Sequence, residues 1–244
     1  MANISMPQRL SNLHTAEELF REEAKLLIEA DLRFSLHLNA VEQAMDLADV
    51  LRQFPTENED LKVVQVLGMR LFNAFGASVK MALSGYGQNS ALVMRDILET
   101  VFLIDLFKGD QLAISRWRHA DKKARMQHFS PVRVREALDK RDGFSGKKRA
   151  EMYEMFSELA GHPTMKSHLM MRPKKGGDAV IGPFIENTTL DAGLSEMGRL
   201  AIQAGELLDA FFPADWRKGD ATRVAFAKLK KLWISEFYSQ IKNR

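Results

Sequence analysis

Two short segments of this 244-residue chain hold the polar side chains best suited to acid–base or anion chemistry. Arg95 and Glu99 are four residues apart, so on a helix they lie on one face. Tyr153 and Ser157 have the same spacing, and His162 follows, held extended by the next proline. A histidine can transfer protons near neutral pH, and an arginine can stabilise negative charge. These two groups, Arg95 with Glu99 and Tyr153 with Ser157 and His162, are therefore the candidate cluster of polar side chains.

Three roles remain open for this cluster. As a structural network it would satisfy charges that are costly to bury without partners. As the active site of a metal-independent ribonuclease, it would use His162 as acid or base, Arg95 to stabilise phosphate charge and Glu99 to orient both. As a pocket it would bind a small molecule. A single histidine without an assured partner is weak evidence for catalysis, so we favour a binding or interaction role.

Other kinds of site find little support in the sequence. The chain has no cysteine, which excludes a thiol nucleophile, a disulfide scaffold and a Cys-ligated zinc site. His14, His37 and His168 have no partner at metal-ligand spacing, so we predict neither a metal nor another cofactor. The Gly85-Tyr86-Gly87 segment lacks the preceding strand and third glycine of a dinucleotide fingerprint. We interpret it as a turn between two helices.

The net charge of +3 conceals an uneven distribution. Residues 108–175 hold 17 lysines and arginines against 8 acidic residues, whereas the rest of the chain holds 18 against 24. A basic segment between acidic flanks can bind a polyanion such as RNA or DNA, but we favour the alternative that these charges pair within the fold. The candidate phosphate contacts are Arg116, Arg118, Lys122, Lys123, Arg125, Lys174 and Lys175.

The elements that position these residues are predicted to be helices. Apolar residues recur every three to four positions, which indicates a single all-α domain, a bundle of seven to eight helices over residues 1–244. We expect a long N-terminal helix within 14–54, capped by Thr15 and broken once at most, then a central region over 60–164. A loop or small β-hairpin follows at 165–187, and C-terminal helices fill 188–244. The helix over 89–107 is apolar around most of its circumference, so we place it at the centre.

The apolar segments also bear on partners and location. The most apolar stretch, residues 91–107, contains four charged residues, whereas a membrane span needs roughly 20 predominantly apolar ones. The N-terminus has no apolar region typical of a secretory signal. We therefore expect a cytoplasmic protein without membrane association. Trp233 and Phe237 on the last helix are candidates for a homodimer contact.

The two polar segments resemble the signatures of a large bacterial family of all-helical proteins whose activity is not established. The first resemblance is carried by Ser84-Gly85-Tyr86-Gly87 and by Arg95-x-x-x-Glu99 in the helix that follows. The second is carried by Tyr153-x-x-x-Ser157-x-x-x-x-His162-Pro163. The resemblance covers roughly residues 72–164. It implies an all-helical fold in which these five side chains meet in one polar cluster, but it implies no activity. In the cluster that this resemblance predicts, Glu99 bridges Arg95 and His162, while Ser157 and Tyr153 complete the hydrogen bonds.

A looser resemblance links the chain to the HEPN helical nucleases of toxin and defence systems. Those proteins carry an arginine and a histidine on one helix with four to six residues between them. The spacing here is shorter in Arg33–His37, Arg116–His119 and Arg125–His128. A nuclease function would therefore depend on the Arg95, Glu99 and His162 cluster and on the basic segment.

Overall fold

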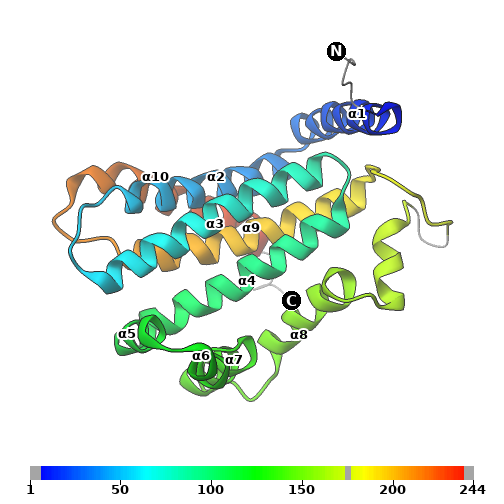
Figure 1. Ribbon diagram of the computed structural model, residues 1–244. Coiled ribbons are helices and arrows are strands. Elements are labelled where there is room, and N and C mark those ends of the chain that lie inside the picture. The colour runs from blue at the N-terminus through cyan, green and yellow to red at the C-terminus, as the bar shows by residue number, and fades with distance from the viewer. Residues whose placement is uncertain (1–6, 174–176, 239–244) are drawn as a thin grey trace, which may run out of the picture.

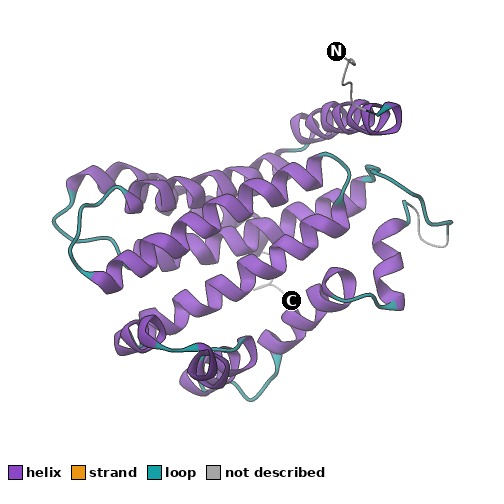
Figure 2. Cartoon of the chain, viewed as in Figure 1, coloured by secondary structure: helices purple, strands orange, loops and turns teal. Residues whose placement is uncertain are grey.

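The computed structural model describes residues 7–173 and 177–238, and within these ranges it is all-α, as predicted (Figure 2). No strand occurs in this part of the chain, and its ten α-helices exceed the predicted seven to eight. The α-helices are α1 (Gln8–Ala30), α2 (Leu32–Arg52), α3 (Glu59–Leu83), α4 (Gly87–Gly109), α5 (Gln111–His119), α6 (Lys122–His128), α7 (Pro131–Asp142), α8 (Lys148–Phe156), α9 (Asn187–Asp209) and α10 (Asp220–Tyr238). Three short helical segments complete the fold: a π-helix η1 (Ser157–Gly161) and 3-10 helices η2 (Met165–Met171) and η3 (Arg217–Gly219).

Helix α4 lies between two groups of helices (Figure 1). On one side α2, α3, α9 and α10 form a bundle in which α2 packs on α3, α9 and α10. On the other side α4 packs on α5, α7, α8 and η1. Leu98 and Ile104 on α4 are completely buried, as is Leu194 on α9. The central position predicted for this helix is confirmed, and it places Arg95 and Glu99 where both groups of helices can reach them.

The N-terminal region is broken once, between α1 and α2, as the prediction allowed, but it begins before Thr15, at Gln8. Asp31 leaves the helical conformation (φ −131°, ψ 110°), and its side chain accepts a hydrogen bond from the Arg33 backbone N–H at 2.9 Å. This bond caps α2 and separates it from α1. Thr15 lies inside α1, where its hydroxyl donates to the Ser11 carbonyl at 3.1 Å. The prediction of Thr15 as the first cap is therefore wrong.

The segment predicted as a loop or hairpin contains helix η2 and irregular chain over the residues that the structure describes. A single backbone bond from Val180 N–H to the Met171 carbonyl, 2.9 Å long, joins its two arms. One such bond does not make a ladder, because a hairpin alternates paired residues along both strands. Residues 110–128 form two short helices, α5 and α6, which are capped by Asp110 and Asp121.

The Gly85-Tyr86-Gly87 segment is the turn between α3 and α4, as interpreted. Gly85 has a φ of +85°, and a Cβ at this position would lie 2.7 Å from the Phe184 nitrogen. Glycine is therefore required by both conformation and space. The Tyr86 hydroxyl donates to the Glu17 carboxylate at 2.8 Å, which anchors α1 to the turn. Within the described residues, no helix is both long and apolar enough to cross a membrane.

Helix α9 carries two glycines that should respond oppositely to alanine. A Cβ on Gly205 would overlap the ring of Phe226, which is buried on α10, whereas a Cβ on Gly193 meets nothing within 4 Å. We expect Gly205→Ala to lower the free energy of unfolding by about 1–3 kcal/mol through overpacking. Gly193→Ala should raise it by about 0.5–1 kcal/mol, because alanine favours the helix. Urea denaturation of both variants checks this, and a stabilised Gly205→Ala would contradict the close approach of α9 and α10.

Candidate functional site

Arg95 is the centre of the polar cluster, which joins α4 to α8. Its Nη2 atom donates to the Tyr153 hydroxyl and lies 3.4 Å from the nearer carboxylate oxygen of Glu99. The Arg95 guanidinium carbon also lies 4.7 Å from the centre of the Tyr153 ring. Arg95 and Glu99 are only 20% and 31% exposed, so their attraction is less screened than that of a surface pair. The structure thus brings together Arg95, Glu99 and Tyr153.

A second arginine that the sequence analysis missed completes this cluster. The Arg135 guanidinium, from α7, lies 4.0 Å from the centre of the Tyr153 ring, within the range of a cation–π contact. Arg95 Nε and Arg135 Nη1 are both buried and have no hydrogen-bond partner. The cluster therefore has more N–H donors than the described residues satisfy. Nothing in the local spacing indicates Arg135, because it lies 40 residues beyond Arg95 on another helix.

Ser157 and His162 do not join the side-chain cluster. The Ser157 hydroxyl is buried and donates to the Tyr153 backbone carbonyl at 2.8 Å, so its hydrogen bond stays within its own helix. The His162 side chain is exposed, and within the described residues its imidazole makes no hydrogen bond or ion pair. The predicted bridge from Glu99 to His162 is therefore not formed. The reason is local, since the His162 backbone N–H bonds to the Ser157 carbonyl and ends a π-helix whose extra residue per turn redirects the chain.

Gly161, the last residue of that π-helix, has a direct role in placing Arg95. A Cβ on Gly161 would lie 2.5 Å from Arg95 Nη1. Glycine at this position therefore leaves the space that the guanidinium occupies beside the Tyr153 ring.

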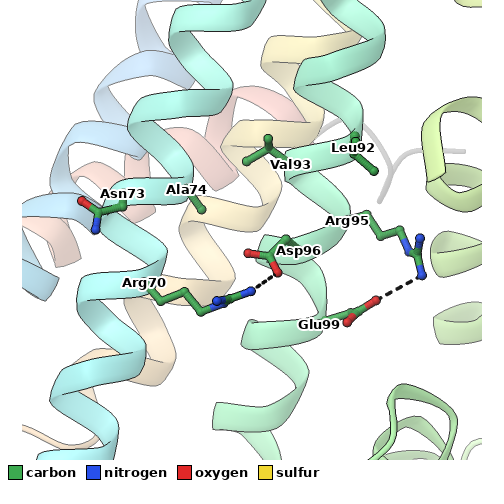
Figure 3. A pocket seen from close by; sticks show the side chains of 8 residues that line it. All are labelled: Arg70, Asn73, Ala74, Leu92, Val93, Arg95, Asp96 and Glu99. Carbon is green, nitrogen blue, oxygen red and sulfur yellow. Dashed lines mark hydrogen bonds and ion pairs between the residues drawn. The ribbon is translucent and has the colours of Figure 1, made fainter.

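An open groove of about 730 Å³ lies between α3 and α4, with Arg95 and Glu99 at one edge (Figure 3). Arg70 on α3 forms an ion pair across it with Asp96 on α4. In Figure 3 the side chains of Asp96 and Arg95 point in opposite directions from α4, one toward Arg70 and the other toward Glu99. The wall consists of Arg70, Asn73, Ala74, Leu92, Val93, Arg95, Asp96 and Glu99.

A second cavity of about 380 Å³ adjoins the groove and shares Arg70, Asp96 and Glu99 with it. The rest of its wall is almost entirely apolar and includes Trp117 and Phe129. Polar and apolar spaces therefore meet at three charged residues. This combination is typical of small-molecule sites, which pair an apolar surface with a few polar groups. Its residues come from α3 to α7, so no single segment of the sequence reveals it.

The predicted phosphate contacts divide into paired and unpaired side chains. Arg116 is paired with Asp110, and Arg118 with Asp60 at 3.2 Å. Three exposed basic side chains on α6 have no ion-pair partner within the described residues: Lys122, Lys123 and Arg125. Lys174 and Lys175 lie outside the described residues.

Metal binding has no visible basis in the described part of the chain, where no group of three histidine or acidic side chains is placed to hold an ion.

Three comparisons of the chain, with known protein families, curated proteins and solved structures, give no match. The resemblances to the bacterial helical family and to the HEPN nucleases therefore stay hypotheses.

Proposed function

We propose that this chain is a small-molecule-binding protein whose ligand occupies the groove and the adjoining cavity. The observation that carries the proposal is the meeting of a polar and an apolar space at Arg70, Asp96 and Glu99. A ligand that spans both spaces has an apolar body, which replaces water against Trp117 and Phe129, and a polar head beside Arg70. Burial of the body is favourable because it removes apolar surface from water.

The unused N–H donors of the arginine side chains favour a ligand with an acidic head group. Arg70 and Arg95 each use only Nη2 for the hydrogen bonds to Asp96 and Tyr153, although a guanidinium has five N–H donors. Unused donors fit a ligand that brings acceptors, such as a carboxylate, sulfonate or phosphate.

Anilinonaphthalene sulfonate is a suitable probe because it combines an aromatic body with an anionic head. We expect it to bind saturably and to receive excitation energy from Trp117. Arg70→Ala should raise the dissociation constant about tenfold, since it removes a charged donor and leaves Asp96 unpaired. Fluorescence titration of wild type and variant measures this change.

The matched control is Arg33→Ala. Arg33 is 55% exposed and paired with an aspartate, as is Arg70 at 56%, but it lies at the start of α2 outside the groove. Equal weakening by both substitutions would show that the probe responds to overall charge, and would refute the groove as its site. Gly161→Ala is a second variant, because its Cβ displaces Arg95 without changing any charge.

Nucleic-acid binding is less well supported. It is favoured by three cations on α6 that are unpaired within the described part of the chain and so are free to contact phosphates: Lys122, Lys123 and Arg125. A ribonuclease also needs an acid–base group near its phosphate-binding arginine. The exposed His162 lacks the hydrogen bond to Glu99 that this role would require.

A further inference from the structure

A separate pocket of about 330 Å³ lies between α4, α8, η1, η2 and α9. Its wall shares no residue with the groove or with the cavity beside it. Most of the wall is apolar, and three methionines on three different elements contribute to it: Met94, Met155 and Met170. The η1 π-helix supplies Leu159 to the same wall. Single π-helical turns occur frequently at functional sites.

The polar side chains of this wall already have partners. The Ser90 hydroxyl is paired with Ser78 at 2.9 Å, and Glu196 forms an ion pair with Arg199 at 2.7 Å. Glu186 accepts hydrogen bonds from the hydroxyls of Thr188 and Thr189 and from the Thr189 backbone N–H. These bonds hold the pKa of Glu186 down at about 2, first of all through the Thr188 hydroxyl. None of the buried polar atoms without a partner belongs to this wall, unlike the Arg95 cluster.

We propose that this pocket is a second binding site, and that it takes an uncharged aromatic molecule of about two fused rings. Because the polar side chains of the wall already have partners, they are not available to pair with a charged group on a ligand. The ligand must therefore gain its affinity from apolar contact. An apolar cavity of roughly 150 Å³ holds one benzene molecule, so a volume of 330 Å³ suits about twice that size. Methionine sulfur makes favourable contacts with aromatic rings, which selects a flat arene over a branched alkane.

Naphthalene is the probe, and isothermal titration calorimetry of the full chain is the measurement. We expect saturable binding at one site with a negative heat-capacity change, the mark of apolar burial. Ala91→Phe places a ring in the pocket from α4 and should abolish binding. Met155→Ala, at a 37% exposed rim position that should tolerate truncation, should raise the dissociation constant about three- to tenfold.

Two control variants distinguish binding in this pocket from binding in the groove. Met126→Ala removes a methionine that is 65% exposed on α6 and outside the pocket, and should leave naphthalene binding unchanged. Arg70→Ala should also leave it unchanged, while Ala91→Phe should leave the sulfonate probe binding as before. The proposal is overturned if naphthalene fails to bind up to its solubility limit. It is equally overturned if Met155→Ala and Met126→Ala behave alike, or if Arg70→Ala weakens naphthalene binding.

Discussion

Trp233→Ala is expected to lower the free energy of unfolding by about 3–5 kcal/mol, the usual cost of truncating a buried aromatic side chain. Trp233 is 3% exposed and packs between α2 and α9, with its ring centre 5.1 Å from that of Phe237. Its indole N–H donates to His37 Nδ1 at 3.0 Å. Alanine would leave both a cavity and an unpaired buried acceptor. Urea denaturation followed by circular dichroism measures the loss.

Leu232→Ala is the control for this substitution. Leu232 is the neighbouring residue on α10 and is 58% exposed, so its truncation should cost only about 0.5 kcal/mol or less. Similar losses for the two variants would contradict the docking of α10 through Trp233.

The burial of Trp233 also bears on the predicted homodimer. Trp233 is occupied within its own chain, so a dimer through α10 would have to use exposed side chains such as Leu232 and Val224.

Acidification from pH 6.5 to pH 4 is expected to cost about 3 kcal/mol of stability through His37 alone. The pKa of His37 is lowered to about 4, mainly by burial and then by the charges of Arg199 and Arg33, while the charge of Asp31 opposes them. His37 takes up a proton near pH 6.5 in the unfolded chain, but only near pH 4 in the folded chain. The stabilisation is therefore complete above pH 6.5 and is lost as the pH falls through this window. Denaturation midpoints in urea at several pH values trace the loss.

His37→Phe separates this effect from general acid sensitivity. The variant keeps a ring to stack on Phe237, whose centre lies 4.2 Å from that of His37, but removes the titrating group. It should be less stable at neutral pH, because the Trp233 N–H loses its acceptor, and its stability should change less between pH 6.5 and pH 4. His128→Phe alters an exposed histidine on α6 and should leave the acid response intact. An unchanged acid response in His37→Phe would assign the loss to other groups.

Parts of the candidate site were predictable from the sequence because they depend on local spacing. Arg95 and Glu99 pair at i, i+4 on one helix, and this pattern is visible in the sequence. The meeting of Arg95 with Tyr153 was expected from the resemblance to the bacterial helical family and not from local spacing. The sequence could not show whether the Glu99–His162 bridge forms, because the π-helical turn at 157–161 decides where His162 points. A single extra residue in a turn leaves no mark on the apolar periodicity.

Residues contributed by distant helices escaped prediction altogether. Arg70 reaches Asp96 over 26 positions, and Arg135 stacks on Tyr153 from a helix of its own. Trp233 reaches His37 over 196 positions. Each contact depends on how two helices are oriented and how deeply they pack, which periodicity does not specify. The same holds for the groove and the pocket, whose walls each combine several helices.

The order of apolar and polar residues alone determined that this chain is all-α, which helix is central, and that Gly85 forms a turn, because these properties follow from local spacing and backbone conformation. The tertiary structure decided which polar side chains meet. It joined Arg95 to Tyr153 and Arg135, left His162 in solvent, and buried His37 against Trp233. It also placed the groove, where arginine N–H donors are unused, apart from the pocket, where the polar side chains of the wall have hydrogen-bond or ion-pair partners. The physical reason is that hydrogen bonding and desolvation depend on distances of a few ångströms between elements, which only the packing of whole helices sets.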